Sequence, residues 1–203
     1  MRFSPSFRQG LHQSLPAALG IFTFGTITGV AVVGAGFGVP AALALGIVVY
    51  AGSATLVAMQ LVLLGAPLAI IGLAAIVVNL RFVLYSITTE PIVRGRSRRF
   101  RALVSYMLSD NGFGLTMVRL ANRVPGENLA EFILGANIAL YTIWAAGIVV
   151  GTALGAAIPP SWSLEFMVTL TFLALGLGPV RDRPMAASFV AAGVVAVLTW
   201  DWP

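Results

Sequence analysis

Long apolar stretches recur along the chain, and they restrict its fold more than any other feature. Seven such elements are separated by prolines and glycines: 15–33, 41–64, 68–88, 102–120, 129–158, 164–177 and 185–200. Several exceed about 18 residues, enough for a helix to span the roughly 30 Å hydrocarbon core of a bilayer. Strands of a membrane barrel would instead alternate apolar and polar residues over about ten positions. The sequence therefore predicts an all-α polytopic membrane protein, with one transmembrane domain over residues 1–203.

Composition and charge narrow the function classes. The chain is 59% hydrophobic and 9% charged, whereas soluble domains carry roughly 25% charged residues. Its net charge of +5 comes from twelve arginines, most of them beside apolar runs, which is the pattern that orients membrane proteins. The chain has no cysteine, which excludes disulfides, thiolate metal sites and a cysteine nucleophile. We therefore expect a lipid bilayer around the chain, and no nucleic-acid partner, no metal and no cofactor.

The distribution of arginines predicts an orientation. The loop from Arg94 to Arg101 holds five arginines, so the positive-inside rule places it in the cytoplasm, together with the N-terminus that carries Arg2 and Arg8. An even number of crossings must then separate the two segments. Three apolar elements lie between them, so one of the three is expected to enter and leave on the same face.

Two elements have polar interruptions that would allow such a return. The element 41–64 is interrupted by Tyr50–Thr55, and the element 102–120 carries Ser109–Gly112 at its centre. The parity argument favours five full crossings with two discontinuous or re-entrant elements, and the alternative is seven plain helices. Opened backbone at membrane depth persists only where protein or a solvated cavity satisfies it. Paired broken helices usually mark a transporter's binding site.

Two charged residues fall inside apolar elements, Arg81 and Asp110. An ionised side chain in the membrane costs at least about 2.5 kcal/mol and normally faces a partner or a water path. Their opposite signs allow an ion pair. For Asp110 a functional and a structural role are both open, whereas Arg81, with Tyr85 on the same helix face, is expected to be structural. Asn79 lies two positions from Arg81, about 200° around a helix, and cannot point at the same spot.

The element 129–158 combines a polar stripe with a glycine ridge. Asn137 and Tyr141 begin a stripe that continues at Trp144, and this spacing is more typical of a hydrogen-bonded packing seam than of a binding site. Glycines recur at four-residue spacing at Gly147, Gly151 and Gly155. Such a ridge lets another helix approach closely. A non-transporting membrane protein that assembles through this ridge is therefore an alternative function.

The residue inventory argues against an enzyme. The chain has one histidine, His12, which lies before the first apolar element, so a serine in the membrane has no histidine base within reach. Asp110 is the single carboxylate that falls convincingly within the membrane, and an aspartyl enzyme needs two. Hydroxyls, amides and one carboxylate suit recognition of a small zwitterionic solute.

The order of motifs resembles the AzlC-type branched-chain amino acid permease family. The matching stretches extend over nearly the whole chain: Pro16–Gly38, Tyr50–Ala54, Asn79–Arg81, Tyr85–Ser86, Leu108–Asn111 with Phe113, Asn137–Gly155 and Leu164–Phe166. The resemblance implies a multi-pass protein of the cell (inner) membrane that exports branched-chain or related hydrophobic amino acids with a small AzlD-type membrane subunit. Thr55, Phe82 and Asn111 depart from the glutamine, histidine and acidic residue common in the family, which leaves the substrate and the coupling ion open. A transporter of another small solute is therefore a further alternative.

We expect the amino acid to bind near the midplane, between the two broken elements. The predicted site residues are Ser53, Thr55, Asn79, Asp110 and Asn111. The substrate carboxylate would face the N–H groups of the half-helices, and its ammonium would face opened carbonyls. Asp110 is also the predicted carrier of a coupling proton, because a low-dielectric surrounding favours the neutral form of a carboxyl group.

Overall fold

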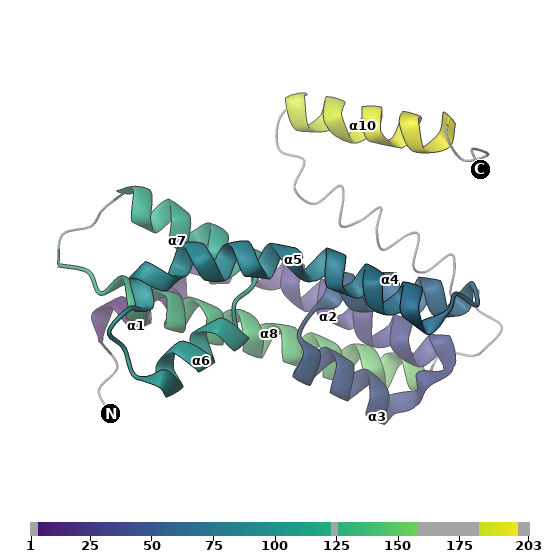
Figure 1. Ribbon diagram of the computed structural model, residues 1–203, viewed down its shortest axis with the longest axis horizontal. Coiled ribbons are helices and arrows are strands. Elements are labelled where there is room, and N and C mark those ends of the chain that lie inside the picture. Colours follow the sequence, from purple (N-terminus) through teal and green to yellow (C-terminus); the bar gives the residue numbers. More distant parts are fainter. Residues whose placement is uncertain (1–3, 123–125, 158–182, 199–203) are drawn as a thin grey trace. The chain divides into compact units, whose positions relative to one another are not determined.

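The computed structural model describes residues 4–122, 126–157 and 183–198, and every regular element in these ranges is helical (Figure 1). The all-α fold is therefore confirmed. The helices are α1 (Pro5–Gln13), α2 (Ala18–Val32), α3 (Gly38–Leu43), α4 (Gly52–Leu63), α5 (Leu68–Val93), α6 (Arg98–Tyr106), α7 (Asp110–Asn122), α8 (Leu129–Ala157) and α10 (Arg183–Leu198).

Three of the described helical runs are long and apolar enough to cross a membrane, namely Pro5–Val49, α5 and α8. The predicted element 164–177 lies outside the described residues, so the number of crossings in the whole chain stays a prediction. Helix α10 belongs to a second unit, residues 161–203, and is described by itself. It is a 16-residue apolar helix that matches the element expected at 185–200.

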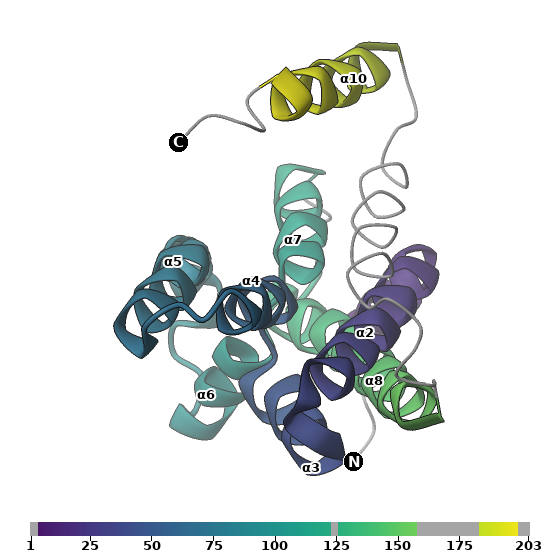
Figure 2. The ribbon, with the colours of Figure 1, turned by 90° about the vertical axis from the view of Figure 1, so that its right-hand side faces the viewer.

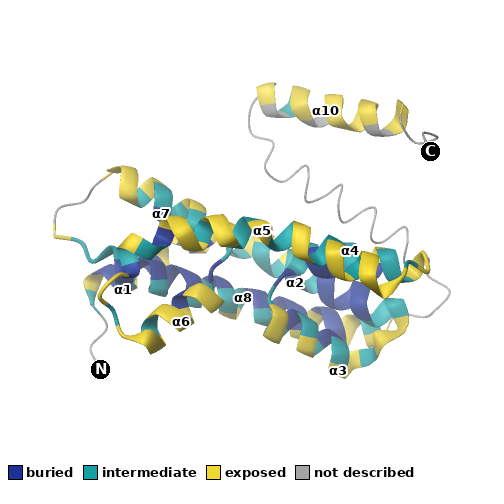
Figure 3. Cartoon of the chain, viewed as in Figure 1, coloured by how far each residue is buried: buried dark blue, intermediate teal, exposed yellow. Residues whose placement is uncertain are grey.

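The contact between α2 and α8 forms the core of residues 1–160, and both views show the two helices side by side (Figures 1 and 2). The glycine ridge of α8 makes this contact. A Cβ on Gly151 would overlap the Thr26 backbone of α2, and α2 also closes the space beside Gly147 and Gly155. Buried residues accordingly follow α8 along much of its length (Figure 3). The ridge is thus occupied by a helix of the same chain.

The first broken element is a re-entrant hairpin, residues 38–63, made of α3, its π-helical continuation Ala44–Val49 and α4. The chain reverses after α2 at Gly36, whose φ of 86° suits glycine. At the tip the helix breaks at Tyr50, which takes the left-handed conformation with φ 50°. Near the base of the hairpin, Ala42 and Met59 pack in one buried cluster. The second arm, α4, therefore returns to the end of the bundle at which the first arm, α3, begins (Figure 1).

The second broken element is also a re-entrant hairpin, residues 98–122, made of α6 and α7. The helix stops after Tyr106 and restarts at Asp110. At its base, α6 packs through Val104 near the end of α5, and α7 runs back until its Arg119 lies over the Phe132 ring at the start of α8. This hairpin enters from the end opposite to the first. The predicted discontinuities are confirmed, and the alternative of plain helices through these two elements is wrong.

Helix α5 runs five residues beyond the expected end at Thr88. Pro91, which follows the predicted element 68–88, lies inside the last turn of α5. Its ring removes one helical hydrogen bond and crowds the preceding turn. Because α5 ends at Val93, any resulting bend affects only the last residues of the helix.

Helix α1 and the basic loop lie at the same end of the bundle. The Arg96 guanidinium donates to the Asn128 side chain at 2.7 Å, and the Asn128 backbone N–H donates to the Ser6 hydroxyl of α1 at 3.0 Å. The opposite end, formed by residues 33–45, 56–75 and 149–157, has no charged residue. Two long helices, α2 and α5, thus run between α1 and the basic loop, which agrees with the even number of crossings expected from the arginine pattern.

Candidate functional site

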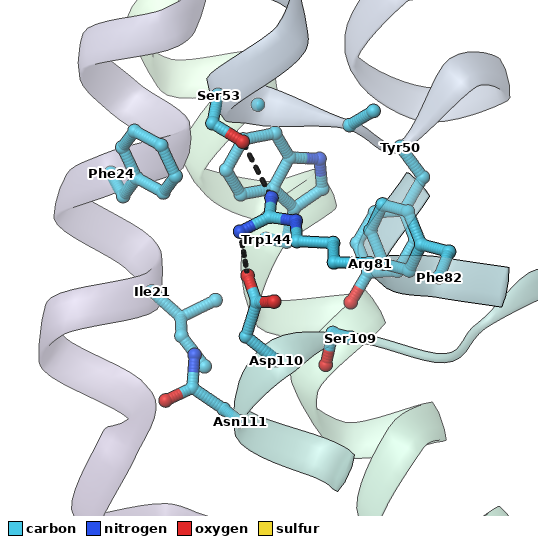
Figure 4. Close-up of a pocket in the computed structure, with 12 residues that line it drawn as sticks. Ile21, Phe24, Tyr50, Ser53, Arg81, Phe82, Ser109, Asp110, Asn111 and Trp144 are labelled. Atoms are coloured by element: carbon cyan, nitrogen blue, oxygen red, sulfur yellow. Dashed lines mark hydrogen bonds and ion pairs between the residues drawn. The ribbon is translucent and has the colours of Figure 1, made fainter. Parts of the chain in front are cut away.

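The tips of the two hairpins meet at a small cavity between α2, α5 and α8 (Figure 4). Its volume is about 70 Å³. The lining side chains come from five segments of the chain, and they are Ile21, Phe24, Tyr50, Ala51, Gly52, Ser53, Arg81, Phe82, Ser109, Asp110, Asn111 and Trp144.

The cavity lies midway along the two long helices. Arg81 is at the centre of α5, and Trp144 is near the centre of α8. At 1.5 Å per residue, Arg81 is roughly 20 Å from either end of its helix. If α5 crosses the bilayer, the charge of Arg81 lies at the midplane, which is the depth at which an unpaired charge costs the most free energy.

Arg81 and Asp110 form the ion pair that their opposite charges allow. The Arg81 Nη1 lies 2.9 Å from the Asp110 Oδ2, and its Nη2 donates to the Ser53 hydroxyl at 2.5 Å. The Tyr85 hydroxyl donates to the other oxygen of Asp110, Oδ1, at 2.8 Å. Arg81 thus connects α5 to the tips of both hairpins. The ion pair is partly exposed, since 33% of the Arg81 side chain and 46% of the Asp110 side chain are accessible.

Two helix N-termini point at the same cavity. In α4 the Thr55 N–H donates to the Ala51 carbonyl at 2.9 Å, so the N–H groups of residues 52–54 precede the helical hydrogen-bond ladder. Helix α7 starts at Asp110, within the cavity lining. The positive ends of two helices and one guanidinium surround a single carboxylate, so the cavity is suited to receive a further anionic group.

Aromatic side chains donate hydrogen bonds to carbonyls near the tip of the first hairpin, where the helix is broken. The Trp144 Nε1 donates to the Gly46 carbonyl at 2.8 Å. The Ile47 carbonyl accepts from Tyr141 at 3.0 Å and from Tyr106 at 2.7 Å. Tyr141 therefore takes part in a hydrogen-bonded seam. Both carbonyls already accept hydrogen bonds from side chains of the same chain, and the role of opened carbonyls in binding an ammonium stays a prediction.

The structure brings three of the five predicted site residues to the cavity: Ser53, Asp110 and Asn111. Thr55 and Asn79 do not line it. Thr55 is 5% exposed on the buried side of α4, and the Asn79 side-chain oxygen is buried without a hydrogen-bond partner. Asn137 is fully buried in α8, where it donates to the Ile133 carbonyl at 2.9 Å.

Apolar and aromatic side chains complete the cavity. The Phe24 ring meets the Trp144 ring edge-on, with centroids 5.4 Å apart, and the Arg81 guanidinium lies 5.2 Å from the centre of the Phe82 ring. Ile21 and Phe24 belong to the apolar element 15–33, which has no charged residue, so nothing in the sequence marked them as lining residues. A volume of about 70 Å³ is well below the roughly 300–1,000 Å³ of ligand pockets. A ligand larger than a few waters therefore requires the hairpins or the ion pair to separate.

Comparisons with known proteins match the part of the chain that includes every residue lining the cavity. A family model described as AzlC protein matches residues 16–158, which contain both hairpins. An uncharacterized membrane protein of Helicobacter pylori (strain ATCC 700392 / 26695) is 25% identical over 177 residues, covering 85% of this chain and 75% of that relative. No solved structure matches the chain.

Proposed function

The chain belongs to the AzlC protein family, and from that premise we propose that it is the larger subunit of a membrane permease that exports branched-chain or other small hydrophobic amino acids. In this proposal the protein catalyses no reaction and uses no cofactor. The charges of the cavity would hold the ends of the amino acid, and its aromatic and aliphatic wall would hold the side chain. Apolar pockets distinguish one methylene by only about 10- to 200-fold, so the specificity should be broad.

One observation carries the proposal: two re-entrant hairpins enter from opposite ends, and their tips meet at an ion pair midway along α5. Two segments run in opposite directions (Figure 1): one is α2 with the first hairpin, and the other is α5 with the second hairpin. Inverted segments of this kind support alternating access, because each can close one side of a fixed central site. A merely structural bundle has no need of broken helices at midplane.

The alternative of a non-transporting assembly protein loses its main support. Its docking surface was the ridge of Gly147, Gly151 and Gly155, and α2 of the same chain occupies that ridge. We propose instead that a small AzlD-type subunit joins the permease elsewhere on its apolar surface.

Efflux of labelled amino acids tests the proposal. Cells that make this chain with its small partner are preloaded with dipeptides of leucine, valine or methionine. We expect faster efflux of at least one of these amino acids than in cells with an empty vector, and slower efflux when either subunit is made alone. Efflux that matches the empty vector for all three, with both proteins detected in the membrane, would contradict the proposal.

We further propose that the protein resides in the cell (inner) membrane with the basic loop in the cytoplasm, because the described arginines outside the cavity and outside α10 gather at that end. The chain has no cysteine, so single cysteines report the orientation without background. An impermeant thiol reagent should modify Ser97→Cys from the cytoplasmic side and Ala66→Cys, at the other end of α5, from the outside. The reverse pattern would overturn this orientation.

A further inference from the structure

The resting ion pair already resembles the two ends of an amino acid. Arg81 and Asp110 present a cation and an anion 2.9 Å apart, and each has a second polar partner, Ser53 for Arg81 and Tyr85 for Asp110. Both charges are reachable from the cavity, because a third or more of each side chain is exposed. The ion pair also connects three separate segments, which are α5 and the tips of the two hairpins (Figure 4).

We propose that the Arg81–Asp110 ion pair is the empty state of a zwitterion-binding site, and that a free α-amino acid binds by inserting between the two side chains. The ligand carboxylate takes the place of Asp110 on Arg81, next to the Ser53 hydroxyl and the first N–H groups of α4. The ligand ammonium takes the place of Arg81 on Asp110, while Tyr85 continues to donate to Oδ1 and leaves Oδ2 free. This inference rests on the proposed function and names the atoms that would recognise its substrate.

Charge balance explains why the ligand has to carry both a carboxylate and an ammonium group. A ligand with one charge would separate the pair and leave the opposite side chain without a partner at mid-membrane depth, where unpaired charges are costly. A zwitterion replaces both halves of the pair at once, so neither charge loses its partner. The site is therefore predicted to reject amines and carboxylates that have the same side chain.

The small volume of the empty cavity follows from the same arrangement. The direct contact of Arg81 with Asp110 holds the hairpin tips together and leaves about 70 Å³. A ligand between the two charges must separate the Arg81 guanidinium from the Asp110 carboxylate. Because Tyr85 keeps its hydrogen bond to Asp110, the tip of the first hairpin, which Ser53 joins to Arg81, moves away from the tip of the second. Binding and movement of the hairpins are thereby coupled in one step.

Competition by half-ligands tests this inference on the purified full-length protein with labelled leucine. Unlabelled leucine should compete in the wild type, whereas 3-methylbutylamine, which lacks the carboxylate, and 4-methylpentanoate, which lacks the ammonium, should compete at least about 100-fold less well. Asp110→Asn should weaken leucine binding at least about tenfold and favour the carboxylate over the amine. Arg81→Gln should favour the amine, and Arg81→Lys should retain part of the leucine affinity.

The chain offers a matched control in a second ion pair of α5, Arg94 with Glu90 at 2.8 Å, away from the cavity. Arg94→Gln should leave the preference for leucine unchanged. A double variant, Arg81→Gln with Asp110→Asn, has no unpaired charge; it should fold and lose the discrimination against the half-ligands.

Two results would overturn this inference without touching the permease proposal. They are half-ligands that compete as well as leucine in the wild type, and leucine affinity that survives each of the two single substitutions. In either case the efflux result, and with it the permease proposal, would stand. A wild type that neither exports nor binds leucine, valine or methionine would overturn both.

Discussion

Asp110→Asn is expected to reduce amino acid efflux at least about tenfold, to near the level of the empty vector. The substitution preserves the shape of the side chain but removes the charge that pairs with Arg81 at 2.9 Å. In our account the ammonium of the substrate then has no anionic partner, and Arg81 has none in the empty site. The measurement is initial efflux of labelled leucine at matched amounts of protein in the membrane.

Two controls separate transport from folding. Glu90→Gln also removes a carboxylate from an arginine partner, but at the exposed end of α5, and it should leave efflux unchanged. The double variant Arg81→Gln with Asp110→Asn removes both charges and should be recovered in folded form without restored efflux. Efflux by Asp110→Asn at the wild-type rate would contradict the assignment of the cavity as the substrate site.

The same variant distinguishes two roles of Asp110. A carboxylate that only carries a coupling proton would be dispensable for exchange of internal for external leucine, since exchange moves no net charge or proton. A carboxylate that binds the ammonium is needed for both reactions. We expect both net efflux and exchange to be lost; loss of net efflux with intact exchange would assign the proton to Asp110 instead.

Gly151→Leu is expected to have the largest effect on assembly. A Cβ at this position would overlap the backbone of Thr26 in α2, and backbone cannot move aside as a flexible side chain can. Overpacking in a close-packed core typically costs about 1–3 kcal/mol and occasionally more, and here it opens the central contact between α2 and α8. We expect little monodisperse protein by size-exclusion chromatography in detergent.

Gly72→Leu is the matched control, because Gly72 is also an interior helical glycine but has nothing within 4 Å of the added Cβ. Leucine favours helix over glycine by up to about 1 kcal/mol, so this variant should be at least as stable as the wild type. Equal yields of folded Gly151→Leu and Gly72→Leu would contradict the close approach of α2 to α8.

The broken helices could be predicted because two independent features of the sequence agreed. The polar stretches Tyr50–Thr55 and Ser109–Gly112 interrupt apolar runs, and the arginine pattern required an even number of crossings before the basic loop. The breaks fall at Tyr50 and just before Asp110. The Arg81–Asp110 pair could be anticipated from charge alone, because two opposite charges in a membrane have strong reason to meet.

The prediction of the cavity lining was less successful, for a reason of helix geometry. Ser53 and Thr55 are two residues apart, about 200° around α4, so one faces the cavity and the other faces away. Asn79 and Arg81 are separated in the same way on α5. Only tertiary structure shows which member of each pair faces the cavity. Partners distant in sequence, such as Ser53 with Arg81 and Trp144 with Gly46, leave no local pattern.

The most direct test of the central claim is the accessibility of a single cysteine in the cavity. Asn111 lines the cavity and is exposed, so Asn111→Cys in this cysteine-free chain can be treated with an impermeant thiol reagent from either side of the membrane, with and without leucine. An alternating-access amino acid site predicts modification from both sides and slower modification when leucine is present. Modification that occurs from one side only, or that leucine does not slow in a variant that still exports, would contradict the account.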